Sequence, residues 1–341
     1  MILHRGPDMT VDFHAHWLPD ALANALRKRA IPPRIAMSDT GEQFHMPVGG
    51  LPYDDIFSDL TARLRFMDAQ RIRTQVLSLP CLFGLDSRPA AEALPLLRIF
   101  NDATAAAAAE NPDRFAGLAA LPFDDVQLAA QEYRRTRREL GLIGAIVPIN
   151  YFQSIDGVAA IAPLLEMAER EGGHLFLHPG RRADEAAATD AEGTNRYPDS
   201  IMARRQLEIQ HQVAAAMVTL LWGGFTDKYQ GFTLHVANMG GTLPMVTERM
   251  DYTSRLRTHE PVLPSERVRN SPIQVDCSSM GPIAITAAVA CFGAGNVLFG
   301  TDNPIYRSEW QLEAVQNARI SGADRQAILH DNGARALAKW R

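Results

Sequence analysis

Short apolar runs alternate with longer segments of helical periodicity along most of the chain. Ile56, Leu60, Leu64 and Met67 recur at helical spacing, and a short apolar run follows them. The same order continues towards the C-terminus. Strands are predicted at 11–16, 74–78, 115–119, 144–148, 174–178, 232–237, 273–277 and 297–300. Helices are predicted at 19–29, 54–70, 90–110, 125–140 and 157–171, in a segment ending at Trp222, and between and after the last strands.

Nearly all of these strands are continuously apolar, which is typical of parallel sheets covered by helices. Eight such strands, each followed by a helical segment, predict a closed (β/α)8 barrel, an α/β fold. A doubly wound open sheet is the alternative. The Gly293-Ala294-Gly295 turn does not favour that alternative, because it precedes a strand whereas a dinucleotide-binding fingerprint follows one.

Neither a linker nor an internal repeat divides the sequence, so we expect a single domain over 1–341. Two long excursions, at about 30–53 and about 179–204, interrupt the alternation of strands and helices. The first is rich in Pro, Gly and polar residues. We expect both excursions to lie over the mouth of the barrel, where they would shape a binding pocket.

Composition narrows the classes of function. The chain has 341 residues, a formal net charge of -5 and 46% hydrophobic residues. This mild acidity argues against a nucleic-acid or anionic-membrane surface. No apolar run reaches the ~18 residues of a membrane span, and residues 1–9 lack the apolar core of a signal peptide. The 3 cysteines are widely spaced, which is typical of reduced thiols in a cytoplasmic protein.

The first predicted strand ends in two histidines, His14 and His16, spaced i, i+2. On a strand this spacing sends both imidazoles to the same face. In a closed barrel that face is the interior, and the C-terminal ends of the strands carry the chemistry. Two imidazoles on one strand form half of a site for a first-row divalent metal. The alternative is a pair of hydrogen-bonded histidines without a metal.

Two later strands end in further candidate ligands. His178 ends the strand at 174–178, and Asp302 follows the strand at 297–300. In a barrel these side chains converge with the histidine pair, and three imidazoles with one carboxylate suit Zn²⁺ or a similar ion. Each residue has an alternative role, His178 as a core histidine and Asp302 as a helix cap.

The strand-end motifs, in chain order, resemble the amidohydrolase superfamily, and within it the branch related to aminocarboxymuconate-semialdehyde decarboxylase. The main motifs are Asp12-Phe13-His14-Ala15-His16, Phe176-Leu177-His178-Pro179 and Phe299-Gly300-Thr301-Asp302-Asn303-Pro304. Supporting motifs are Arg65-Phe66-Met67-Asp68, Asn111-Pro112-Asp113-Arg114-Phe115, Met239-Gly240-Gly241 and Asn332-Gly333-Ala334-Arg335. The resemblance implies that His14, His16, His178 and Asp302 bind one divalent metal, usually zinc or manganese. It also implies that Asp302 takes part in proton transfer.

Two positions depart from the family pattern. Asn238 stands where relatives usually carry the histidine that activates a metal-bound water. His235 lies three residues earlier, where strand alternation would point it to the opposite side, so we expect it to be structural. In the first excursion, His45 stands where some decarboxylases carry an arginine that binds a substrate carboxylate; imidazole is a weaker and different anchor.

Three more residues are candidates for the substrate pocket. Trp17 follows the histidine pair and would either stack on a planar substrate or serve only in packing. Asp276 ends a strand and would bind a ligand, support a metal-bound histidine or cap a helix. His211 is expected near the start of a helix, where it would supply a displaced base.

Members of the family decarboxylate aromatic or muconate-type acids, hydrolyse lactones or hydrate ring-cleavage products. We expect decarboxylation of a small planar carboxylate, with Asp302 delivering a proton and Asn238 orienting the substrate, because this reaction depends less on the missing histidine. The alternatives are a metal-dependent hydrolase or hydratase, and an inactive barrel that binds a metal or metabolite. The resemblance and the segment 249–257 also indicate a homodimer.

Overall fold

Eight parallel strands form the centre of the fold. The computed structural model describes residues 10–47, 49–186 and 201–341. Neighbouring strands pair in the order β1-β5-β6-β7-β8-β9-β10-β11. Their bounds are β1 (Thr10–His16), β5 (Ile72–Ser78), β6 (Phe115–Ala119), β7 (Gly144–Pro148), β8 (His174–His178), β9 (Thr233–Val236), β10 (Gln274–Asp276) and β11 (Val297–Leu298). All eight coincide with predicted strands.

The barrel closes between β1 and the segment that follows β11. The amide of Phe13 donates to the carbonyl of Phe299 at 2.8 Å, and that of Asp302 to the carbonyl of His14 at 2.7 Å. Further along, His16 donates to the carbonyl of Asn303 at 2.7 Å. The predicted (β/α)8 barrel is therefore confirmed, and the open-sheet alternative is excluded.

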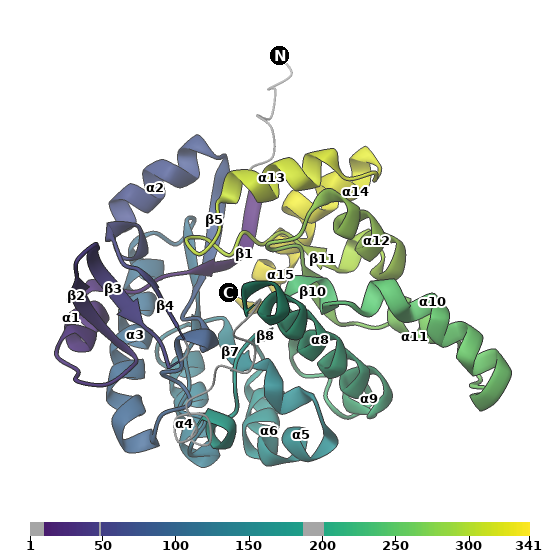
Figure 1. The fold of residues 1–341 in the computed structure, drawn as a ribbon, viewed down its shortest axis with the longest axis horizontal. Coiled ribbons are helices and arrows are strands. Elements are labelled where there is room, and N and C mark those ends of the chain that lie inside the picture. The colour runs from purple at the N-terminus through teal and green to yellow at the C-terminus, as the bar shows by residue number, and fades with distance from the viewer. Residues whose placement is uncertain (1–9, 48, 187–200) are drawn as a thin grey trace.

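Helices surround the strands (Figure 1). Their bounds are α1 (Asp20–Arg27), α2 (Leu60–Ala69), α3 (Ala90–Glu110), α4 (Val126–Arg138), α5 (Ile155–Ala160), α6 (Ala162–Glu171), α8 (Ile201–Trp222), α9 (Phe225–Lys228), α10 (Leu243–Thr253), α11 (Pro264–Arg269), α12 (Pro282–Phe292), α13 (Ser308–Asn317), α14 (Gly322–Gln326) and α15 (Asn332–Trp340). The helix predicted at 54–70 is interrupted, because the Asp59 side chain accepts from the amides of Thr61 and Ala62 and starts α2 afresh.

The interior of the barrel is packed with side chains. Phe13, Val76, Ile146, Phe176 and Leu298 belong to one buried cluster contributed by five different strands or strand ends. A larger apolar cluster fills the space between the outer face of the strands and the helices. The interior is thus solid below the C-terminal ends of the strands, as is typical of this architecture.

The first excursion folds into a small antiparallel sheet of its own. Its strands are β2 (Arg34–Ser38), β3 (Gly41–His45) and β4 (Gly50–Pro52). Phe44 packs on Phe83 with ring centroids 4.3 Å apart, and Phe83 lies just beyond the C-terminal end of β5. A Cβ built on Gly49 would lie 3.5 Å from the guanidinium of Arg205 in α8. The sheet therefore reaches from the rim at β5 towards α8. Residues 187–200 of the second excursion lie outside the described residues.

Among the described residues, no helix is both long and apolar enough to cross a membrane.

Asp86, which follows β5, is expected to make stability depend on pH. Burial raises its pKa from 3.8 to about 7, despite a hydrogen bond with the Cys81 thiol. The folded chain keeps a proton that the unfolded chain releases, so this stabilising contribution is present at low pH and lost as pH rises through 7. The loss amounts to up to about 4 kcal/mol at roughly 1.4 kcal/mol per pKa unit. We expect Asp86→Asn to flatten this decline, measured as urea midpoints from about pH 5 to about pH 8. Equal pH dependence in the two proteins would contradict the expectation.

Candidate metal centre

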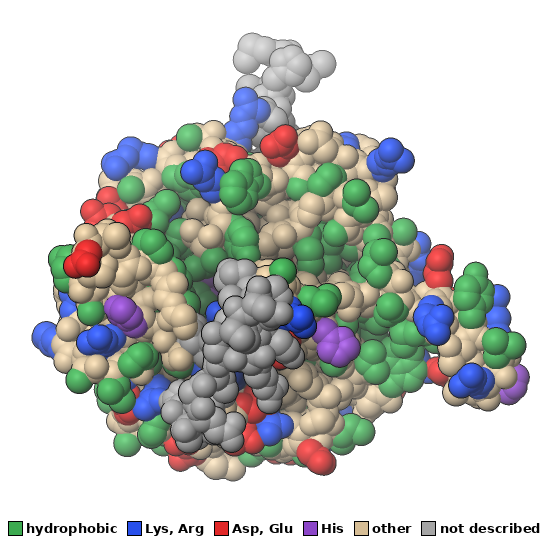
Figure 2. Space-filling model, viewed as in Figure 1, with side chains coloured by type: hydrophobic (Ala, Val, Ile, Leu, Met, Phe, Trp, Pro, Cys, Tyr) green, Lys and Arg blue, Asp and Glu red, His purple; other side chains and the backbone are tan. Residues whose placement is uncertain are grey.

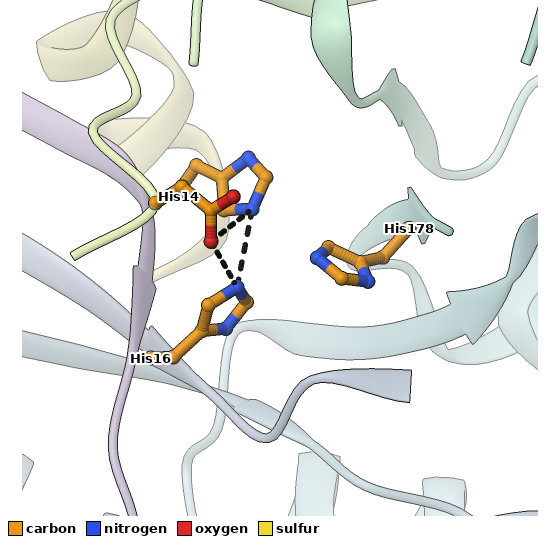
Figure 3. A group of neighbouring side chains, drawn as sticks. His14, His16 and His178 are labelled. Carbon is orange, nitrogen blue, oxygen red and sulfur yellow. Dashed lines mark hydrogen bonds and ion pairs between the residues drawn. The ribbon is translucent and has the colours of Figure 1, made fainter. Parts of the chain in front are cut away.

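Three imidazoles and one carboxylate meet at the C-terminal ends of the barrel strands. One potential ligand atom from each of His14, His16, His178 and Asp302 lies within 4.8 Å of the other three. β1 supplies the first two, β8 supplies His178, and the segment after β11 supplies Asp302. Figure 3 shows His178 facing the pair of imidazoles on β1. The structure thus brings together the four residues that the sequence marked as metal ligands.

A local irregularity in β1 aims the pair of histidines. The pairing of β1 with β5 shifts register between Asp12 and Ala15, and the Asp12 carboxylate accepts from the amide of His14 at 3.1 Å. The segment after β11 packs closely against β1 at Gly300, where a Cβ would lie 2.6 Å from the Cβ of His14. A glycine is needed here because β11 and β1 approach so closely.

Each imidazole of the cluster uses its Nδ1 atom for a hydrogen bond that points away from the centre. Nδ1 of His14 lies 3.0 Å from Oδ2 of Asp276, and Nδ1 of His178 lies 2.9 Å from the carbonyl of Pro179. Nδ1 of His16 lies 3.0 Å from the hydroxyl of Ser78, which itself donates to the carbonyl of Ala15. All three partners act as acceptors, so each Nδ1 carries a proton and each Nε2 atom faces inward.

The inward-facing atoms lie close enough together to share one positive charge. Nε2 of His14 lies 3.2 Å from Nε2 of His16, and the Asp302 carboxylate lies 3.0 Å from the latter. Burial lowers the pKa of His14, but Asp276 and Asp302 outweigh it and raise the pKa to about 9. Burial lowers the pKa of His16, and it lowers that of His178 well below its usual range. A divalent cation satisfies all four donors at once, so the residues present fit such an ion.

Asp276 supports the cluster from below and is completely buried. Its Oδ2 accepts from Nδ1 of His14 and, at 2.8 Å, from Nε2 of His235. Its Oδ1 accepts from the amides of Asn238 and Ser278. Burial favours the neutral acid, yet these donors hold the pKa well below its usual range. From the sequence, Asp276 is expected to bind a ligand, support a metal-bound histidine or cap a helix. Its hydrogen bond with His14 favours the second of these roles.

Asn238 and His235 are not related by strand alternation. β9 ends at Val236, and Asn238 adopts a left-handed backbone with φ 55°. The expectation that His235 and Asn238 point to opposite sides assumed a continuous strand, and the chain turns before Asn238. His235 lies inside the barrel, where its ring stacks on Phe176 with centroids 4.3 Å apart. Asn238 lies at the C-terminal end of β9, with 8% of its surface exposed.

The remaining pocket candidates lie at different depths. Trp17 is buried, and its indole donates to the carbonyl of Ser58 at 3.0 Å, which fits packing. His45 ends β3 and is partly exposed. His211 is exposed in the middle of α8 rather than near its start, because that helix begins at Ile201. In the part of the chain that the structure describes, no hydrogen bond joins these three side chains to the four-residue cluster.

A buried clamp beneath the cluster escaped the sequence analysis. Arg63 on α2 donates to the carbonyl of His16 at 2.6 Å and to the side chains of Gln75 and Asn303. It thereby ties the end of β1 to the residue after Asp302. The available signal was an arginine on the apolar face of a helix, four residues before Met67 and three after Leu60.

Comparison with known proteins places this arrangement in a family. The model of the amidohydrolase family matches residues 11–339. The chain is 30% identical over 284 residues to a gamma-resorcylate decarboxylase of Polaromonas sp. (strain JS666), an alignment covering 78% of this chain and 83% of that protein. It is 26% identical over 306 residues to the 2-amino-3-carboxymuconate-6-semialdehyde decarboxylase of Dictyostelium discoideum, covering 87% and 82% of the two chains.

A solved structure shares the fold. The dihydroxybenzoic acid decarboxylase from Polaromonas sp. JS666, with bound manganese and the inhibitor 2-nitroresorcinol, aligns with a TM-score of 0.69 and 23% identity. The alignment covers 98% of each chain. The chain belongs to the amidohydrolase family, in its decarboxylase branch, and the resemblance seen in the sequence motifs is confirmed. The His/Asp cluster together with these relatives supports a single divalent metal site.

Proposed function

We propose that this chain is a metal-dependent, non-oxidative decarboxylase of a small, planar, aromatic or muconate-type carboxylic acid. The observation that carries this proposal is the pairing of an intact His3Asp cluster with an amide at Asn238. An amide cannot take a proton near neutral pH, so a base at this position is not available. The decarboxylases among the relatives support the same reaction.

The proposed reaction uses Asp302 as the proton donor. Its side chain is 13% exposed, whereas that of His16 is 1% exposed and that of His14 fully buried, so Asp302 faces the side from which a substrate enters. With Asp302 in its acid form, the bond between the ring carbon and the carboxylate breaks, its electron pair stays on the carbon and CO2 leaves. Asp302 gives its proton to that carbon and becomes a carboxylate. A divalent ion held by His14, His16, His178 and Asp302 supplies Lewis-acid stabilisation of negative charge on a substrate oxygen.

The neighbouring residues hold the substrate in this scheme. The amide of Asn238 orients the substrate by hydrogen bonding. His45 and His211 remain candidates for contacts with its carboxylate or ring substituents. Trp17 and Asp276 do not contact the substrate in this scheme. Trp17 packs beneath the site, and Asp276 acts through its hydrogen bond with His14. We propose zinc as the resident metal and manganese as the alternative, since three imidazoles and one carboxylate suit both.

Metal removal tests the proposal directly. We expect the purified protein to contain about one zinc or manganese ion per chain. A chelator should abolish CO2 release from a panel of hydroxybenzoates and ring-cleavage acids, and should lower the melting temperature, because binding to the folded state alone contributes a few kcal/mol. Added zinc or manganese should restore both. Absence of stoichiometric metal, with stability indifferent to chelators, would favour the inactive barrel and overturn the proposal.

A hydrolase or hydratase remains the second candidate, because the same cluster would activate water with Asp302 as base. Lactones assayed beside the carboxylic acids separate the two reactions, and hydrolysis without CO2 release would decide for the second. The variant Asn238→His sharpens the comparison. A large gain in hydrolytic rate would identify the natural chain as a weakened hydrolase.

We further propose that the protein is a homodimer that uses α10. This helix projects from the barrel (Figure 1), and hydrophobic side chains lie on the projection (Figure 2). Met245 and Tyr252 on α10 are 75% and 63% exposed, and Leu256, in the helical turn Ser254–Thr258 that continues α10, is 78% exposed. A groove of about 300 Å³ beside the helix is lined in part by Val246 and Met250. It provides an apolar surface against which a second copy of the chain could pack.

The variant Leu256→Glu is expected to weaken the dimer at least tenfold, because it places a charge in an apolar contact. Light scattering during size-exclusion chromatography measures the change in mass. Ile155→Glu on α5, an equally exposed apolar position at 70%, is the matched control and should leave the mass unchanged. A natural chain that is monomeric at micromolar concentration would contradict the dimer.

We also propose a cytoplasmic location and one domain for 1–341. The location is supported by the three cysteines, Cys81, Cys277 and Cys291, all of which are free thiols. The single domain is supported by the barrel, in which the segment after the last strand returns to the first strand, with the amide of Asp302 donating to the carbonyl of His14.

A further inference from the structure

A column of four hydrogen-bonded groups runs down the barrel from the metal centre. Nε2 of His174 lies 3.1 Å from Nδ1 of His235, and Nε2 of His235 lies 2.8 Å from Oδ2 of Asp276. The same oxygen lies 3.0 Å from Nδ1 of His14. The four side chains come from β8, β9, β10 and β1, and all four residues are fully buried.

The proton positions along this column can be assigned in order, starting at Asp276 and moving down through His235 to His174. Oδ2 of Asp276 only accepts, so His14 and His235 both donate to it. Burial lowers the pKa of His235, and it lowers that of His174 well below its usual range, so both rings are neutral. Nδ1 of His235 is then an acceptor, and His174 donates to it through Nε2. Nδ1 of His174, a bare lone pair in this scheme, has no hydrogen-bond partner in the described structure.

The rings of the column are held by their packing. Phe176 stacks on His235 with an interplanar angle of 18° and meets the ring of His14 edge-on at 4.7 Å. Phe13 lies 5.0 Å from the ring of His174. Rotation of either lower imidazole would lose both a buried hydrogen bond and these contacts, so the column has one orientation.

At the top of the column, Asp276 contacts two parts of the candidate active site. Oδ2 of Asp276 holds His14, while Oδ1 accepts from the amide of Asn238 at 3.3 Å, where the backbone is left-handed. We propose that His235, supported by His174, is a positioning residue of the metal centre. By donating to Asp276 it fixes the rotation of this carboxylate, and through it the tautomer of His14 and the backbone of Asn238. This inference rests on the proposed function, because it assigns His14 to the metal.

Removal of the His235 donor would leave Oδ2 of Asp276 with His14 as its remaining partner. Oδ1 would still accept from the amides of Asn238 and Ser278, but Oδ2 would lose one of its two donors, and His14 would be held less firmly. Partners of this kind, one step from a metal ligand, typically change metal affinity by about 10–100-fold when they are lost. Phe176 and Phe13 would pack against an apolar ring at this position, but the imidazole of His174 would lose its acceptor, so folding is checked separately.

Two amide variants separate positioning from packing. In His235→Gln the amide nitrogen occupies the place of Nε2 and donates to Asp276. In His235→Asn it occupies the place of Nδ1 and faces His174. Both substitutions bury an amide, but asparagine is one methylene shorter and leaves the larger cavity. The melting temperature of the metal-free protein is therefore compared for the two variants, and a loss of metal affinity without a matching loss of stability indicates positioning. His235→Phe, which keeps the ring and removes both nitrogens, is the third variant.

The measurement is the dissociation constant for Zn²⁺ and Mn²⁺ by competition with a chromogenic chelator, with circular dichroism as a check of folding. We expect His235→Gln to bind within a few-fold of the natural chain, and His235→Asn and His235→Phe to bind about 10–100-fold more weakly. Equal affinities for the Gln and Asn variants would overturn the inference. If the natural chain binds neither metal, the proposed function fails instead. If Phe does not fold, the comparison of Gln with Asn still decides.

Discussion

Asp302→Asn is expected to abolish CO2 release almost completely. Asparagine can neither hold nor deliver a proton, and loss of one acid-base group typically costs about 10²–10⁴ in rate. The amide is also a weaker ligand than the carboxylate, which lies 3.0 Å from Nε2 of His16. Rates are therefore measured at saturating manganese, with metal content determined on the same samples. This design separates loss of the proton donor from loss of the ion.

Asp331→Asn is the matched control for this prediction. Asp331 is half exposed and pairs with His330 on the surface, away from the four-residue cluster. The control should keep the activity of the natural chain. An Asp302→Asn variant that retains metal and full decarboxylation would show that the proton comes from another group, and the proposed role of Asp302 would be wrong.

The four residues of the cluster could be predicted because each lies at or just beyond the C-terminal end of a largely apolar strand. Predicting that these residues meet requires only two facts: the strands form a parallel barrel, and their C-terminal ends converge. Both facts follow from a local pattern of apolar and polar positions. The prediction therefore did not depend on packing details across the barrel.

What lies beneath the cluster depends on such details. The contact of His235 with Asp276 joins neighbouring strands at a depth that the register of β9 with β10 determines. β9 ends at Val236, so the strand alternation assumed between His235 and Asn238 does not extend to Asn238. The irregularity in β1 and the close approach at Gly300 arise in the same way, from neighbours distant in sequence. The small β2-β3-β4 sheet escaped prediction because its strands are short and polar.

Asp276→Asn is expected to weaken metal binding at least 10–100-fold. The carboxylate accepts from four donors, two imidazoles on Oδ2 and two backbone amides on Oδ1. An asparagine offers one oxygen, so its NH2 group must face either the imidazoles or the amides. If it faces the imidazoles, His14 must move its proton to Nε2, where it blocks the ion. If it faces the amides, two buried donors lose their acceptor at about 1–3 kcal/mol each.

The measurement is the dissociation constant for Zn²⁺ together with the melting temperature of the metal-free protein. Asp86→Asn is the control, because it also neutralises a buried carboxyl but lies outside the hydrogen bonds of His14. We expect Asp86→Asn to keep the affinity of the natural chain, whereas Asp276→Asn loses it even where its metal-free fold remains stable. Unchanged affinity in Asp276→Asn would mean that His14 keeps its tautomer without the carboxylate. The column through His235 would then have no path by which to act on the ion.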